Sequence, residues 1–184
     1  IAQIRKGILM ISKVRSCGLM GIDGFMVDVQ TDISNGMPNF GLVGLPDAAV
    51  KEAKDRVHAA IKNSGFKMPA KKITVNLAPA NMRKEGSGYD LPIAVSILNE
   101  SGQLNSDEIE NSIFIGELAL SGEVNPISGV LPIVISAYKH GFRKFFVPAD
   151  NADEAAVIKG AEVYPVNCLE QLYSHLMGFS KIEP

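Results

Sequence analysis

The residues whose types and spacing could do chemistry lie in one polar stretch, Ala80–Ala94, which reads ANMRKEGSGYDLPIA. Ser87 stands just before a predicted helix, and the free N–H groups of a helix N-terminus can stabilise an oxyanion. Lys84 or another lysine could then act as its base, in a Ser-Lys arrangement. The composition of Gly86–Gly88 is also that of a plain turn. Because Lys84 precedes the glycines and no GxxxxGK[ST] sequence occurs, we do not expect nucleotide binding through a P-loop.

The elements that must position this stretch are a strand before it and a helix after it. Ile73, Val75 and Leu77 alternate with polar residues, which predicts a half-buried strand. Asp90 is predicted to be the N-cap of the following helix, with Pro92 in its first turn. That helix, LPIAVSIL, is apolar nearly all round, so we expect it at the centre of the domain.

The order of elements in the rest of the chain predicts an α+β or α/β domain, of which we favour α+β, a mixed sheet with packed helices. Apolar alternation from Ile11 to Ile33, interrupted at Gly21–Gly24, indicates a hairpin. The clearest helix begins at Pro46-Asp47, carries a Glu52–Arg56 pair and ends at Gly65. The later predicted elements are a hairpin IFIGELALSGEVNPI with Ser121-Gly122 at its tip, a helix near 129–140, a strand over 144–148, a helix over 151–160 capped by Asn151, a strand over 162–166 and a helix over 168–177.

Composition limits the kind of protein that this chain can be. Its 184 residues, 46% of them hydrophobic, suit one domain with a sizeable core. A net charge of −2 does not indicate a strong nucleic-acid or membrane binder, and no apolar run reaches the roughly 18–20 residues that span a bilayer. Cys17 and Cys168 are expected to be reduced, with a single disulfide as the alternative. The three histidines, His58, His140 and His175, are scattered, so we expect no metal site.

Three stretches carry a resemblance to a known family: FGLVGLPDAAVKEAKDRVHAAI, ITVNLAPANMRKEGSGYDLPIA and IFIGELALSGEVNPISGVLPI. Together they resemble the N-terminal domain of the bacterial Mg-chelatase-like AAA+ ATPases, the family of ComM and YifB. The resemblance implies the fold of the Lon proteolytic domain, within the ribosomal protein S5 domain 2-like group, over residues 10–178. Residues 1–9 would be an upstream extension or a cloning remnant, and residues 179–184 the start of a linker to an AAA+ module.

The similarity to Lon also implies that this chain lacks the catalytic serine and lysine of Lon. Gly88 stands where Lon has its nucleophilic serine, and Ser87 is one position early. Leu131 stands where Lon has its catalytic lysine, and residues 123–138 contain no lysine. The resemblance thus implies an active-site scaffold without its chemistry, and a Ser-Lys peptidase that uses Ser87 is the alternative. The residues expected to serve as loop hydrogen-bonding partners or caps are Glu85, Gly86, Asp90 and Glu117.

Charge provides the other signal. Residues 57–84 hold six basic side chains and no acidic one, in a chain that is otherwise net negative. Such a stretch is either a solvated surface or a phosphate-binding face. The DNA-binding candidates are Lys62, Lys67, Lys71, Lys72, Arg83 and Lys84.

The family resemblance completes the functional expectation. It implies a cytoplasmic ATPase that forms a hexameric ring and acts on DNA, with ATP and Mg²⁺ bound by the AAA+ module and no cofactor in this chain. The domain would then serve ring assembly or DNA engagement. A module that contacts only proteins is a further alternative.

Overall fold

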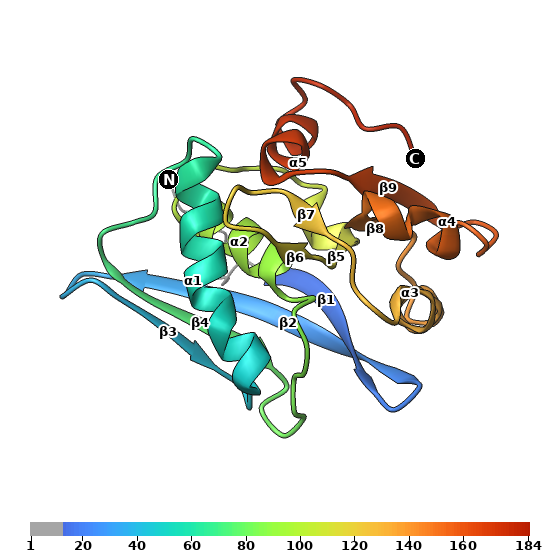
Figure 1. Ribbon diagram of the computed structural model, residues 1–184, viewed down its shortest axis with the longest axis horizontal. Helices are drawn as coiled ribbons and strands as arrows, with labels where there is room; N and C mark the ends of the chain where they lie inside the picture. The colour runs from blue at the N-terminus through green and yellow to red at the C-terminus, as the bar shows by residue number, and fades with distance from the viewer. Residues whose placement is uncertain (1–12) are drawn as a thin grey trace, which may run out of the picture.

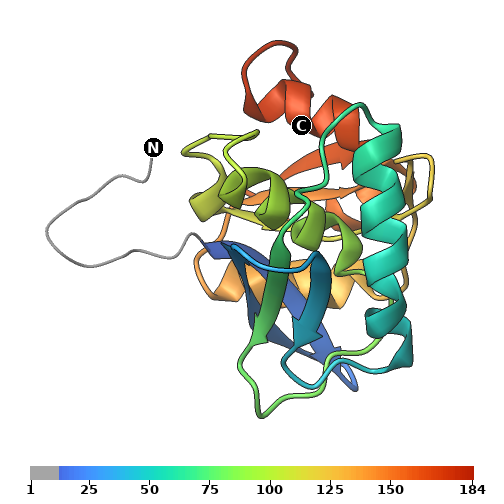
Figure 2. The ribbon, with the colours of Figure 1, turned by 90° about the vertical axis from the view of Figure 1, so that its left-hand side faces the viewer.

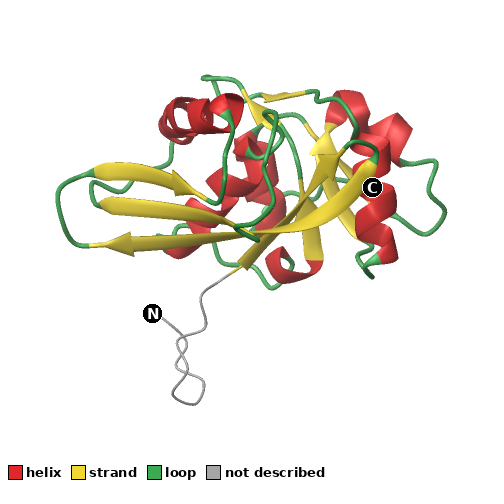
Figure 3. Ribbon diagram, turned by 90° about the horizontal axis from the view of Figure 1, so that it is seen from below, coloured by secondary structure: helices red, strands yellow, loops and turns green. Residues whose placement is uncertain are grey.

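The computed structural model describes residues 13–184. A seven-stranded sheet forms the centre of this part of the chain (Figures 1 and 3). The predicted extension, residues 1–9, and the start of the first predicted strand lie outside it. The strands are β1 (Lys13–Met20), β2 (Asp23–Ser34), β3 (Asn39–Val43), β4 (Lys72–Ala78), β5 (Ser112–Phe114), β6 (Glu117–Leu118), β7 (Val124–Asn125), β8 (Lys144–Pro148) and β9 (Glu162–Val166). The α-helices are α1 (Ala48–Asn63), α2 (Asp90–Glu100), α3 (Val130–Lys139), α4 (Ala152–Ala155) and α5 (Leu169–Leu176), with short 3-10 turns at Ile109–Asn111 and Ala149–Asn151.

The sheet is mixed, as predicted. Its strand order is β3-β4-β2-β1-β5-β8-β9, and β6 pairs with β7 in a separate two-stranded hairpin. β1 and β2 form a long antiparallel hairpin from Lys13↔Gln30 to Met20↔Asp23, and β2 pairs antiparallel with β4. The remaining pairs, β3–β4, β1–β5, β5–β8 and β8–β9, are parallel. β1 therefore joins an antiparallel region to a parallel one.

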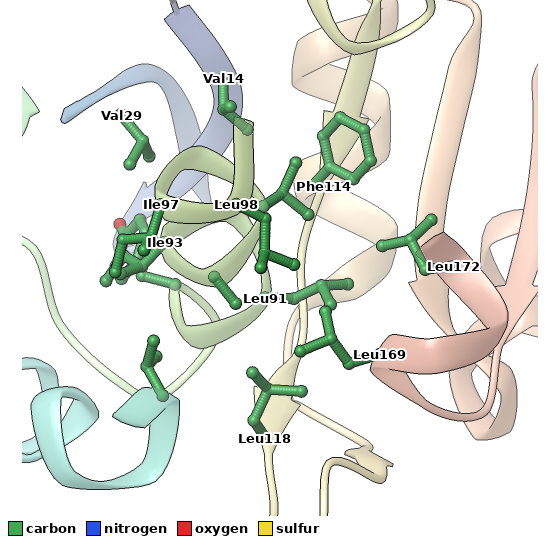
Figure 4. Close-up of a cluster of buried hydrophobic side chains, with 14 of the residues drawn as sticks. Val14, Val29, Leu91, Ile93, Ile97, Leu98, Phe114, Leu118, Leu169 and Leu172 are labelled. Atoms are coloured by element: carbon green, nitrogen blue, oxygen red, sulfur yellow. The ribbon is translucent and has the colours of Figure 1, made fainter. Parts of the chain in front are cut away.

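Alternating side chains divide the core between the two faces of the sheet. In β8, Phe146 faces one hydrophobic cluster, whereas Phe145 and Val147 face the other, as the two-residue period of a strand requires. The first cluster holds α1, α2 and α5, and the second holds α3 and α4 (Figures 1 and 2). α2 is central, as predicted: Leu91 and Leu98 point into packed side chains from strands and from α5 (Figure 4).

Periodicity predicted α1 well. Its buried residues are the predicted ones, Val50, Ala53, Val57, Ala60 and Ile61. The helix begins at Ala48, just after the Pro46-Asp47 start that was predicted. Asp47 is the N-cap, and its Oδ1 accepts the Val50 N–H at 2.8 Å. Gly65, at φ +85°, follows the C-cap, where a left-handed residue is expected.

Three later predictions need correction. The helix predicted over 151–160 is only Ala152–Ala155, and Asn151 makes no capping bond. The Asn151 amide instead bonds the backbone N–H and C=O of Ile127, which fixes the approach to α3. Ile113 and Phe114, predicted within a hairpin, belong to β5 of the main sheet, and only β6 and β7 flank the tip at Ser121-Gly122.

The segment after α5, predicted to begin a linker, packs back onto the domain. Ile182 is buried in the first cluster, and its N–H donates to His175 Nδ1 at 2.9 Å. His175 is buried too, and its ring makes edge contacts with the stacked rings of Phe146 and Tyr164. The chain is therefore held against α5 as far as residue 182.

Candidate functional site

The polar stretch crosses from β4 to α2 and is clamped to the N-terminal end of α1. The Lys84 N–H donates to the Leu45 carbonyl at 3.1 Å, and the Asp47 N–H donates to the Lys84 carbonyl at 3.0 Å. Asp47 Oδ2 also accepts the Gly86 N–H at 3.4 Å. These bonds fix the loop from both sides before it reaches Ser87.

Lys84 is buried and cannot contact a phosphate, so its assignment as a DNA-binding residue was wrong. Its side chain has no exposed surface, and its Nζ donates to the carbonyl of Pro79. Burial lowers the pKa of Lys84. The aliphatic part of the Lys84 side chain packs inside the loop, and its ammonium group donates to the Pro79 carbonyl. Both contacts give Lys84 a structural role.

Ser87 has a carboxylate as its partner and not a lysine. Its hydroxyl hydrogen-bonds Glu117, whose Oε1 also accepts Asn125 Nδ2 at 3.1 Å. Burial alone would raise the pKa of Glu117, but bonds from Ser87 and Asn125 and the charge of Arg56 hold it below its ordinary value. A carboxylate with a lowered pKa is a poor general base, and its bond to Ser87 ties the loop to β6.

Asp90 is not the N-cap of α2, which corrects the sequence-based assignment. It is the first helical residue, the cap position is Tyr89, and no side chain there makes a capping bond. The completely buried Asp90 carboxylate accepts Arg56 Nε at 2.6 Å, Arg56 Nη2 at 3.0 Å and the Leu118 N–H at 3.0 Å. Burial raises the pKa of Asp90 to about 6, against the opposing effect of Arg56.

Arg56 is the partner of Asp90, and the sequence analysis did not predict this contact. It joins α1 to the start of α2 through the bidentate pair and also donates to the Ala49 carbonyl at 3.1 Å. The predicted contact with Glu52 exists, at 3.7 Å on the surface. Helical spacing could find only this weaker partner, because Asp90 is 34 residues away in sequence.

The two positions that the Lon resemblance assigns to the dyad are occupied by Gly88 and Leu131. Gly88 accepts the Gly116 N–H at 2.9 Å and lies against Ile127, so a side chain there would crowd that isoleucine. Leu131 lies in the first turn of α3, half-buried. Within residues 13–184, His, Cys, Asp and Glu side chains form no group of three placed to hold a metal ion. Both cysteines are free, Cys17 buried in the second cluster and Cys168 partly exposed.

The remaining basic candidates are exposed but do not form one patch. Lys62, Lys67, Lys71 and Lys72 follow the connection from the end of α1 to the start of β4; we call these four the basic connection. Arg83 lies beyond the other end of β4, a seven-residue strand of about 20 Å, and pairs with Glu85 at 3.2 Å. It lines an open hollow of about 400 Å³ with residues 45–48 and Lys51.

Comparison with known proteins now gives the family. The model that describes subunit ChlI of Mg-chelatase matches residues 29–151, more than half of the chain. This chain therefore belongs to the Mg-chelatase ChlI family. Competence protein ComM of Haemophilus influenzae is 42% identical over 169 residues, covering 92% of this chain and 33% of that protein. The uncharacterized protein YifB of Escherichia coli is 41% identical over 175 residues, covering 95% of this chain and 34% of that protein.

The chain thus spans about a third of the length of these relatives. A more distant similarity, 24% identity over 172 residues, relates 86% of the chain to 21% of Lon protease 1 of Sorangium cellulosum. Each helix in residues 13–184 is too short or too polar to cross a lipid bilayer.

Proposed function

We propose that this chain is a non-catalytic domain of a Mg-chelatase-like AAA+ ATPase and that it engages DNA through the basic connection. The observation that carries the proposal is the exposure of Lys62, Lys67, Lys71 and Lys72 on one segment that contains no acidic residue. Lysines spaced along one segment contact phosphates without reading sequence, so binding would be weak and dependent on salt. The name of the relative ComM, a competence protein, supports a role in DNA processing.

The rest of the proposal concerns the whole protein. The fold belongs with the Lon proteolytic domain in the ribosomal protein S5 domain 2-like group, a placement supported by the mixed sheet and by the Lon similarity. ATP and Mg²⁺ bind outside this chain, the full protein forms a hexameric cytoplasmic ring, and this domain serves its assembly as well as DNA contact. A ring would add weak contacts from each copy through effective concentration.

Matched double variants test the DNA contact. Lys71→Gln with Lys72→Gln should weaken binding to a fluorescent duplex and lower the slope of log K against log salt by up to about two units. Lys139→Gln with Lys159→Gln removes the same charge from exposed sites at α3 and after α4 and should change neither quantity. Equal effects of the two pairs would show that the basic connection is only a solvated surface, and a protein-interaction module would then be the better description.

The peptidase alternative is tested separately. Ser87 bonded to a carboxylate, with Gly88 and Leu131 at the dyad positions, should give no turnover of casein or peptides. The assay compares the chain with its Ser87→Ala variant. Turnover that disappears with this one substitution would overturn the non-catalytic assignment.

A further inference from the structure

Three aromatic rings from separate parts of the chain meet at one end of the molecule. Phe66 follows α1, Tyr173 lies in α5, and Phe179 lies in the segment after α5. The ring centroids of Phe66 and Tyr173 are 4.6 Å apart, and those of Tyr173 and Phe179 are 6.3 Å apart. We call these three residues the aromatic end. Figures 1 and 2 show the last turn of α1 and helix α5 side by side there.

The outer ring is exposed yet held in place. Phe66 and Tyr173 pack against the first core cluster, whereas Phe179 is 72% exposed. The N–H of Phe179 donates to the Ser174 carbonyl at 2.8 Å, and Ile182, three residues further on, is buried. Since the backbone is bonded on one side of Phe179 and packed on the other, the ring stays beside α5 and faces solvent.

Exposed lysines flank the residues of the aromatic end in the sequence. Lys67 follows Phe66 directly, and Gln103 binds both the N–H and the C=O of Lys67, at 2.9 and 2.7 Å, so its backbone is fixed. Lys62 precedes Phe66 by one helical turn, and Lys181 Nζ donates to the His175 carbonyl at 3.3 Å. All three lysines are exposed. Glu170, three residues before Tyr173, and the exposed Glu183, two residues after Lys181, carry negative charge nearby and would moderate the affinity.

An exposed aromatic ring among lysines fits one class of ligand particularly well. Bases of a single strand present open faces that stack on an aromatic ring, while their phosphates accept from lysines. A duplex hides those faces. We propose that the aromatic end binds single-stranded nucleic acid, with a base stacked on Phe179 and phosphates held by Lys62, Lys67 and Lys181. This inference rests on the proposed DNA engagement and adds a preference for single strands.

Substitution of the exposed ring tests the stacking. Phe179→Ala should weaken binding of a fluorescent 20-nucleotide oligothymidine by at least about fivefold, the lower end of the effect of losing one stacked base. Duplex affinity should not change. Phe179→Tyr keeps a ring and should retain wild-type affinity. The control is Ile22→Ala, which trims an apolar side chain that is 86% exposed at the β1–β2 turn, far from α5 in Figures 1 and 2.

A fluorescent reporter gives a second readout. The chain contains no tryptophan, so Phe179→Trp introduces a single one at an exposed site. Oligothymidine should quench its emission with saturation, and duplex should not.

The outcomes separate the two proposals. Wild-type affinity of Phe179→Ala for the single strand, alongside weakened binding by the Lys71 and Lys72 variant, would overturn the stacking and leave DNA engagement standing. Absence of binding to either DNA by wild-type chain would overturn both. A drop in oligomer mass in light scattering of Phe179→Ala, without a change in DNA affinity, would assign the aromatic end to contacts between copies and overturn the inference.

Discussion

Removing Arg56 should be the most informative single change in the loop region. Arg56→Met keeps much of the side-chain volume but deletes both hydrogen bonds to the Asp90 carboxylate. Asp90 is completely buried and Arg56 only 20% exposed, so water cannot replace the lost donors fully. Breaking a buried pair by removing one partner costs about 3–5 kcal/mol. Because a carboxyl with a pKa of about 6 can take up a proton when its partner is lost, we expect a loss of about 3 kcal/mol at pH 7, the lower end of that range.

The pH dependence follows from the same pKa. The folded-state pKa of Asp90 lies above its ordinary value, so the stabilisation tied to its protonated form is present below about pH 4 and is lost as pH rises through 6. At pH 5 most wild-type molecules already carry a neutral Asp90. Arg56→Met then removes hydrogen bonds from a charged guanidinium to a neutral carboxyl, worth about 1.5 kcal/mol, the lower end for a bond with one charged partner. The cost of the substitution should therefore shrink as pH falls from 7 to 5.

Urea unfolding followed by circular dichroism at the two pH values measures this cost. Glu52→Gln is the control, since Glu52 is 73% exposed and 3.7 Å from Arg56, and its loss should cost at most about 0.5 kcal/mol. Combining Arg56→Met with Asp90→Asn removes both charges and should cost less than Arg56→Met alone. A loss below about 1 kcal/mol at pH 7, or the same loss at both pH values, would refute the buried ion pair as a structural tie.

Two further predictions concern the fold. Burial lowers the pKa of His175, so the stabilisation by the neutral imidazole is complete above about pH 6.5 and is lost as pH falls through the lower folded-state pKa. In urea unfolding, the difference in unfolding free energy between wild type and His175→Asn should therefore narrow from pH 7.5 to pH 5. A constant difference would contradict this. Gly44→Ala should cost about 3 kcal/mol or more, because φ is +107° and a Cβ would lie 2.2 Å from the Leu77 carbonyl oxygen. Gly41→Ala, whose Cβ would meet its nearest atom at 3.8 Å, should cost less in the same thermal melts.

Local periodicity predicted the elements that depend on local pattern. The buried face of α1 follows from side-chain spacing, and β8 and β9 have the bounds predicted for the strands over 144–148 and 162–166, so these predictions are confirmed. Asn151 shows where local pattern fails to predict the structure. Asparagine is a common N-cap residue, but the side chain of Asn151 hydrogen-bonds the backbone of Ile127 instead. The competing partner lies 24 residues away, beyond any spacing rule.

The candidate site was less predictable, because its key contacts are all long-range. Asp90 has the local sequence of an N-cap, and only the packing of α1 against α2 brings Arg56 to it. Lys84 was counted with the exposed basic residues because polar loops are usually solvated, yet the pairing of its backbone with residues 45–47 draws it inward. Phe66 is next to Lys67 in the sequence, but the rings of Tyr173 and Phe179 that complete the aromatic end come from more than 100 residues further along the chain.

The position of β1 in the sheet has a consequence for how the chain folds. β1 and β2 are adjacent in sequence and can form their hairpin within about 1–10 μs. The other edge of β1 must wait for β5, because the Ser16 hydroxyl donates to the Phe114 carbonyl across 98 residues of chain. Forming such a long-range contact costs loop entropy before the contact can stabilise the fold. The pairing of β1 with β5 should therefore set the folding rate. On the ribosome, the β1 edge stays unpaired until β5 emerges, and during that interval the nascent domain is most exposed to aggregation.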